Sequence, residues 1–162
     1  RSTLFPYTTL FRSQPLPLAV RRLEAADVVV LKAAPLGGVR RALVLAERLD
    51  LPAVVCSALD TSVGVGAGLR LAAALPVLEY ACGLGTVGLL SSDVAIPSVL
   101  PVRGVLPLRP VHVSETMLAA AGADDDLTAR WATRLTHVLA ALTERREREA
   151  ADRLSPVAGL PL

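Results

Sequence analysis

One lysine stands where the sequence could use it for chemistry. Lys32 is the only lysine in the chain, and all other basic side chains are arginine. It follows Val28–Leu31, an apolar run of the kind that forms a strand buried on both faces. A desolvated lysine shifts its pKa readily, whereas arginine stays charged. Lys32 is therefore the first candidate for a catalytic group.

Two loops add groups that could bind an anion. Ser57–Ser62 follows a second apolar run, and Gly83–Thr86 follows a third. Both loops offer backbone N–H groups and hydroxyls, which would suit a carboxylate held by dipoles. Simple helix capping by Ser57, Asp60, Thr61 and Ser62 is an equally good interpretation.

Other suggestive patterns are weaker. Gly83, Gly85 and Gly88 spell G-x-G-x-x-G, but a dinucleotide site needs a helix directly afterwards and an acidic residue about 20 positions on. Prolines follow instead, and Arg103 stands where the acid should be. A Rossmann site is therefore not expected.

The sequence carries no metal-binding pattern. His112 and His137 have no partner at ligand spacing. Asp124–Asp126 are three acids at a predicted helix start, where they complement the helix dipole.

Alternating strands and helices would position the candidate residues. The strand runs end about 25 residues apart, which indicates βαβ units and a parallel sheet. We expect Lys32, Ser57 and Gly83 to converge at the carboxyl edge of that sheet. The expected strands are Val28–Leu31, Ala53–Cys56 and Val77–Cys82, and the expected helices are Pro17–Ala25, Val39–Leu49 and Ser62–Ala74.

The pattern changes in the second half. Ser91–Pro110 is rich in proline, with a short β-like piece at Val102–Leu106. A short helix is predicted over Ser114–Ala121 and a long amphipathic one over Asp124–Arg153, followed by a loose tail. The mixed charges late in the long helix are typical of a solvated face.

Composition excludes several classes of protein. Of the 162 residues, 52% are hydrophobic and 3% aromatic, so the core should consist of Ala, Val and Leu. The longest uncharged stretches are broken by Pro76, Glu79 and glycines before they reach a membrane span of about 20 residues. Cys56 and Cys82 lie in apolar contexts, which favours reduced thiols and a cytoplasmic protein.

The first residues have a different origin in our interpretation. Thr3–Ser13 resembles the in-frame translation of a widely used sequencing adapter, and residues 1–13 are set aside as non-native. Without Arg1 and Arg12, 15 basic residues face 15 acidic ones. The basic balance is then no evidence for nucleic acid or a membrane as partner. We expect the chain to be a fragment whose upstream part is missing.

Three segments in order resemble the last third of the o-succinylbenzoate synthases of actinobacterial type, in the enolase superfamily. They are A-A-D-V-V-V-L-K-A-A-P-L-G-G, P-A-V-V-C-S-A-L-D-T-S-V-G and Y-A-C-G-L-G-T, within Pro17–Asp93. The resemblance implies an α/β fold, the C-terminal part of a (β/α)8 TIM-type barrel with three to four βα units. Residues 14–100 would be this partial barrel. Residues 101–162 would carry the long helix and pack on the barrel or a capping domain.

The resemblance also implies a reaction. Members are lyases of menaquinone biosynthesis that dehydrate 2-succinyl-6-hydroxy-2,4-cyclohexadiene-1-carboxylate to o-succinylbenzoate, with Mg²⁺ stabilising an enediolate. Lys32 matches the catalytic lysine at the end of the sixth strand. Cys56, Ser57 and Ala58 match a substrate-binding stretch that often reads Ser-Ser-Ala. Gly83 matches the loop near the succinyl carboxylate of the dicarboxylate substrate.

Several family parts are expected upstream. The second catalytic lysine and the acidic Mg²⁺ ligands would precede this chain, and Tyr7–Thr9 stand where the third ligand would lie. The partner that completes the site would be the N-terminal part of the same enzyme, so we expect the chain alone to be inactive.

Two other functions stay open. An N-succinylamino acid racemase shares the scaffold and uses lysines on both faces of a carbon acid. A non-catalytic α/β module would have no need of Lys32.

Overall fold

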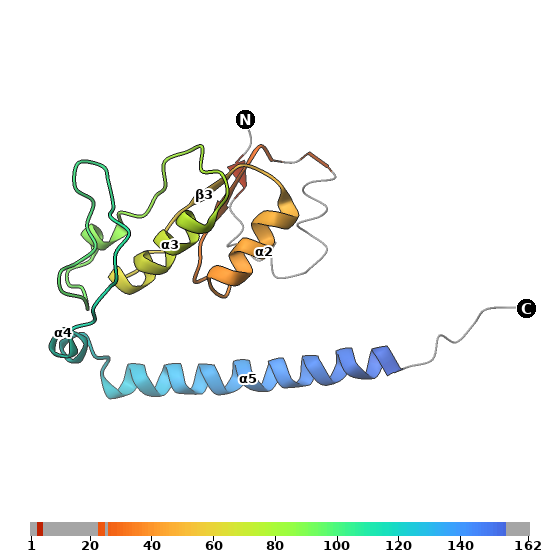
Figure 1. Cartoon of the computed structure of the whole chain (residues 1–162). Helices are drawn as coiled ribbons and strands as arrows, with labels where there is room; N and C mark the ends of the chain where they lie inside the picture. The colour runs from red at the N-terminus through yellow and green to blue at the C-terminus, as the bar shows by residue number, and fades with distance from the viewer. Residues whose placement is uncertain (1–2, 5–22, 25, 155–162) are drawn as a thin grey trace, which may run out of the picture. The chain divides into compact units, whose positions relative to one another are not determined.

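The computed structural model describes residues 3–4, 23–24 and 26–154 (Figure 1). The chain divides into two compact units, residues 1–121 and 122–162. The elements are β1 (Thr3–Leu4), β2 (Val28–Leu31), α2 (Val39–Leu49), β3 (Ala53–Val55), α3 (Ser62–Ala74), the 3-10 helix η2 (Thr86–Leu89), α4 (Glu115–Ala120) and α5 (Asp125–Leu154).

A small parallel sheet is the centre of the first unit. β2 pairs with β3 in parallel, with Leu31 opposite Val55. One isolated parallel bridge, between Cys56 and Gly83, continues the sheet beyond β3. The first two predicted strands are confirmed, and their parallel pairing follows from the helix that connects them.

The predicted third strand, Val77–Cys82, is wrong. Only the bridge at Gly83 remains of it. Val77 is 61% exposed and Leu78 is 44% exposed, and Glu79 after them is exposed as well. The run has strand propensity, but among the described residues it has no apolar layer to cover it, and burial is what such propensity reflects.

The pairing of β1 was not foreseen. Thr3 lies opposite Val28 and Leu4 opposite Val29, in parallel with β2. These two residues belong to the segment that we set aside as non-native. Main-chain pairing at an open sheet edge requires little of the side chains, which explains how such a segment can add to β2. The rest of that segment, most of the predicted helix Pro17–Ala25 and the tail after Leu154 lie outside the described residues.

Helices α2 and α3 confirm their predicted bounds. Gly37 and Gly38 have φ of 85° and 107°, a region that glycine adopts without strain, and they turn the chain from β2 into α2. Asp50 ends α2 in the left-handed conformation, with its N–H donating to Ala46 O at 3.0 Å. Pro76 follows the end of α3, as expected for a helix stop.

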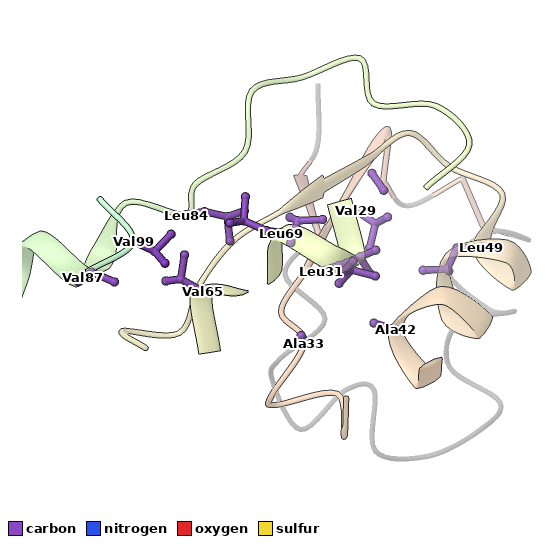
Figure 2. Close-up of a cluster of buried hydrophobic side chains, with 13 residues drawn as sticks. Val29, Leu31, Ala33, Ala42, Leu49, Val65, Leu69, Leu84, Val87 and Val99 are labelled. Atoms are coloured by element: carbon purple, nitrogen blue, oxygen red, sulfur yellow. The ribbon is translucent and has the colours of Figure 1, made fainter. Parts of the chain in front are cut away.

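The core lies between the sheet and these helices (Figure 2). The two helices contact each other, and α2 contacts β2 while α3 contacts β3. Val29, Leu31 and Val55 belong to this core and are fully buried. The other core residues with no exposure are Ala42, Leu49, Val65 and Leu71. As composition predicts, small aliphatic side chains fill the interior.

The glycines of α3 serve packing. A Cβ at Gly68 would lie 2.6 Å from Leu84 Cδ2, and one at Gly66 would lie 2.8 Å from Val111 Cγ2. Both helical positions therefore accept side chains of later segments where any larger residue would collide. This close approach accounts for residues that cost helix propensity.

The second half contains the two predicted helices. The Ser114 hydroxyl caps α4 by accepting from Met117 N–H at 3.4 Å, and Asp124 Oδ1 caps α5 by accepting from Leu127 N–H at 2.7 Å. Arg145 and Glu149 pair at 2.7 Å on the exposed surface of α5. The packing of α5 on a barrel or capping domain stays a prediction.

A buried carboxylate fastens the loop after η2 to the start of α3. One oxygen of Asp93 accepts from the N–H groups of Ser62 (3.0 Å) and Val94 (2.8 Å), and the other accepts from the Ser62 hydroxyl. The Ser62 hydroxyl itself accepts from Val99 N–H at 2.7 Å. Burial alone would raise the pKa of Asp93, but the hydrogen bonds from Ser62, Ser98 and Val94 together lower it below 3.8.

This pKa gives a pH-dependent stability. The native carboxyl binds its proton less tightly than the unfolded one, so the stabilisation is complete above about pH 4 and is lost as pH falls through the native pKa. Asp93→Asn should lower the free energy of unfolding at pH 7 by about 1–3 kcal/mol, because it removes the charge and replaces the oxygen that accepts from the Ser62 hydroxyl with an NH2 group. Urea unfolding at pH 7, 4 and 3 measures it.

Asp125→Asn, at an exposed acid, is the matched control. The difference in free energy of unfolding between the Asp93→Asn variant and the unchanged chain should become smaller below pH 4. An equal gap at every pH would contradict the role of the carboxylate.

Candidate functional site

The carboxyl ends of the parallel segments meet at one edge. Lys32 follows β2 directly and Cys56 follows β3 directly. Cys56 N–H donates to Leu31 O at 2.9 Å, and Gly83 N–H donates to Val55 O at 2.9 Å. These bonds hold Lys32, Cys56 and Gly83 on neighbouring segments at the same edge. This is the edge expected from the sequence, although Gly83 belongs to a single bridge and not to a full strand.

The two faces of the sheet carry different side chains at this edge. Leu31 and Val55 point into the core beneath α2 and α3. Side chains alternate between faces along a strand, so the next residues, Lys32 and Cys56, point to the face that these helices do not cover. Lys32 is half-buried there, which fits a cation that a substrate could reach.

Gly83 shares that face with Cys56. A Cβ on Gly83 would lie 2.8 Å from Cys56 Sγ, so the sulfur occupies the space that a larger residue would need. The contact therefore explains why a glycine stands at position 83 opposite Cys56.

Ser57 is placed differently. Its side chain is 6% exposed, and its N–H and hydroxyl both donate to Gly83 O, at 2.9 and 3.1 Å. The Ser57 hydroxyl also accepts from Thr86 Oγ1 at 2.8 Å. Sequence reasoning included Thr86 only as part of a loop, and no local pattern pointed to its contact with a residue 29 positions earlier.

The remaining loop residues have internal partners too. Ala58 is exposed, and its N–H donates to Asp60 Oδ2 at 2.8 Å. Ser62 and its N–H are held by Asp93. Helix capping, one of the two sequence interpretations, is not observed, because Thr61 is the N-cap of α3 and its side chain makes no capping hydrogen bond. The loop is held instead by Asp60 within it and by the distant Asp93. The substrate-binding roles of Ser57 and Ala58 stay predictions.

The described residues do not supply a magnesium site. Nowhere in the described ranges do three or more His, Cys, Asp or Glu side chains gather in a way that could hold a metal ion. Mg²⁺ requires near-octahedral oxygen ligands, usually anchored by carboxylates, so these residues do not fit it.

A hollow of about 650 Å³ lies at the opposite edge, beside the amino end of β3. Pro52 and Ala53 contribute to it, together with residues from the ends of α2 and α3. It is remote from the strand ends that carry Lys32 and Cys56. Its lining includes the carboxylates of Glu47 and Glu79 and no basic residue, so it offers no cation to a substrate carboxylate.

The contact of Gly83 with Cys56 is testable. Gly83→Ala should lower the free energy of unfolding by about 1–3 kcal/mol, because the new methyl overlaps the sulfur in a packed site. Cys56→Ala should remove the overlap, so the double variant should recover much of the loss. A thermodynamic cycle from urea unfolding measures this coupling.

Gly85→Ala is the matched control, since a Cβ there would meet only Pro101 at an ordinary 3.6 Å. Equal losses for Gly83→Ala with and without the cysteine would show that the contact is not the cause.

Curated relatives at 50–59% identity confirm the resemblance seen in the motifs. The chain is 59% identical over 133 residues to an o-succinylbenzoate synthase of Thermobifida fusca, covering 82% of this chain and 41% of that protein. It is 53% identical over 119 residues to one of Mycolicibacterium smegmatis, covering 74% and 37%. The chain thus spans about two fifths of the length of these relatives. No family model matches it.

Solved structures confirm the predicted fold class. An N-succinyl Arg/Lys racemase from Bacillus cereus superimposes with a TM-score of 0.63 at 20% identity, over 73% of this chain and 32% of that one. A muconate cycloisomerase variant superimposes with a TM-score of 0.57 at 21% identity, over 64% and 31%. At these identities the likeness concerns the fold alone.

Proposed function

We propose that this chain, which is similar to o-succinylbenzoate synthases over most of its length, supplies part of the active site of such an enzyme. The observation that carries the proposal is the placement of Lys32 beside Cys56 and Gly83 at the carboxyl edge of a parallel sheet. This edge is where enzymes built on such barrels bind their substrates. The reaction would be the syn-dehydration that forms o-succinylbenzoate for menaquinone.

Lys32 would act through its charge and its proton. In this reaction a carbon acid loses a proton and a hydroxyl group leaves as water, with negative charge developing on a carboxylate. An ammonium held at the substrate stabilises such an anion without reorganising. Lys32 is half-buried on the face that α2 and α3 leave open, which supports this assignment.

Magnesium is part of the proposal only for the complete enzyme. It would stabilise the enediolate when bound, and its ligands would come from residues outside this chain. The two cysteines are free thiols, which fits a reducing compartment such as the cytoplasm. No helix among the described residues is both long and apolar enough to cross a membrane.

A chimera tests the proposed function. The aligned segment of the Thermobifida fusca relative is replaced by the matching residues of this chain, and conversion of the cyclohexadiene substrate is measured with Mg²⁺. We expect turnover within about tenfold of the unchanged relative, because 59% of the aligned residues are identical. A folded chimera without turnover would contradict the proposal.

Lys32 variants of the chimera test its role. Lys32→Ala should lower kcat by about 10²–10³-fold, by analogy with a lost oxyanion donor, and should change the free energy of unfolding by less than about 1 kcal/mol. Lys32→Arg should also fail, since arginine is larger and does not give up its proton. Arg40→Ala, at an exposed cation of α2, is the matched control. Normal turnover in either lysine variant would make Lys32 structural.

The chain by itself should be inactive. Residues 14–162 contain one lysine, and their described part contains no metal-binding cluster. We therefore expect no turnover at any Mg²⁺ concentration when these residues are assayed alone. Turnover above that of a Lys32→Ala version of the same chain would refute this expectation.

Two other functions give different results in the same experiment. Racemisation of N-succinylamino acids is supported by the structural neighbour from Bacillus cereus, whose identity to this chain is 20%. It predicts that the chimera racemises these substrates faster than it dehydrates the cyclohexadiene. A non-catalytic α/β module predicts that a folded chimera lacks both activities.

A further inference from the structure

We propose that Ser57 and Thr86 are positioning residues that hold the Gly83 turn against the strand ends, and that Ser57 does not itself bind the substrate. The inference rests on the proposed function. It assigns Thr86 a role that the sequence did not indicate, and it changes the role expected for Ser57.

Both hydrogen-bond donors of Ser57 are already used within the protein. Ser57 has two donors, its N–H and its hydroxyl, and both donate to Gly83 O. A substrate carboxylate only accepts hydrogen bonds. The Ser57 hydroxyl therefore has no proton left for it, and one acceptor position is already filled by Thr86 Oγ1 at 2.8 Å.

Alternation along the strand also separates Ser57 from Lys32. Lys32 and Cys56 point away from the core beneath α2 and α3, and the next residue after Cys56 should point the other way. Ser57 is also less accessible, at 6% exposed, than Lys32 and Cys56, which are half-buried. A buried serine on the side of the helices is badly placed for a substrate that meets Lys32.

The hydroxyls of Thr86 and Ser57 form a chain of hydrogen bonds that ends at Gly83 O. Thr86 Oγ1 donates to Ser57 Oγ, and Ser57 Oγ donates to Gly83 O, so the bonds run from the start of η2 back to the turn before it. They close a ring around residues 83–86 and tie it to the end of β3. The turn that carries Gly83 is thereby fixed at the same edge as Lys32. Such fixing matters for catalysis, since small displacements of a binding group reduce rates strongly.

The test compares single and double variants of the chimera described above. Ser57→Ala and Thr86→Val should each raise KM for the cyclohexadiene by about 3–10-fold with a smaller effect on kcat, the size expected for one lost hydrogen bond. The double variant should raise KM no further than the single ones, because both changes break the same chain of bonds. Thr86→Ser keeps the hydroxyl and should stay within about twofold of the unchanged chimera.

Thr136→Val is the matched control, because its hydroxyl bonds to Ala132 O within α5. If Ser57 bound the substrate directly, Ser57→Ala would raise KM more than Thr86→Val does, and the two increases would multiply in the double variant. That result would overturn the inference. An unchanged KM in Thr86→Val, with the chimera active, would overturn it as well.

A second measurement does not depend on activity. In the full 162-residue chain, the urea midpoints of the two single variants and the double variant should show coupling between Ser57 and Thr86. If the two substitutions changed the urea midpoint additively, Ser57 and Thr86 would not be coupled, and the inference would be overturned. An inactive chimera together with coupled midpoints would count against the proposed function and leave the hydroxyl chain as a structural device, without the positioning role.

Discussion

The parallel register of β2 and β3 is the constraint on which the candidate site depends. Leu31 lies opposite Val55, so the residues that follow, Lys32 and Cys56, reach the sheet edge at the same level. A slip by one residue would turn every side chain of one strand to the other face and would separate the lysine from its neighbours. In the observed register Val29, Leu31 and Val55 all belong to the buried core.

The core thus determines which side chains lie on the opposite face of the sheet. Helices α2 and α3 cover one side of the sheet, where buried aliphatic side chains form the core (Figure 2). Alternation along the strands then assigns Lys32 and Cys56 to the other side. Gly83 lies against the Cys56 sulfur, so its lack of a side chain is a packing requirement.

Sequence patterns were sufficient where structure is local. Val28–Leu31, Val39–Leu49 and Ser62–Ala74 have the predicted bounds, because periodicity, glycine turns and prolines act within a few residues. The run Val77–Cys82 failed, since a strand also needs a covering layer that no local pattern reports. Ser57 could be found as a candidate, but its bond to Thr86 spans 29 residues, and only the fold brings the two together.

These contacts also limit how the edge could hold a dicarboxylate. Ser57 spends both its donors on Gly83 O, Ala58 N–H is taken by Asp60, and Ser62 N–H is taken by Asp93. The groups that looked like an anion-binding loop in the sequence therefore stabilise the loop itself. Among the candidate residues Lys32 is the one that carries a positive charge. Under the proposed function a second carboxylate would therefore need groups other than these loop donors, and the chimera is the experiment that supplies them.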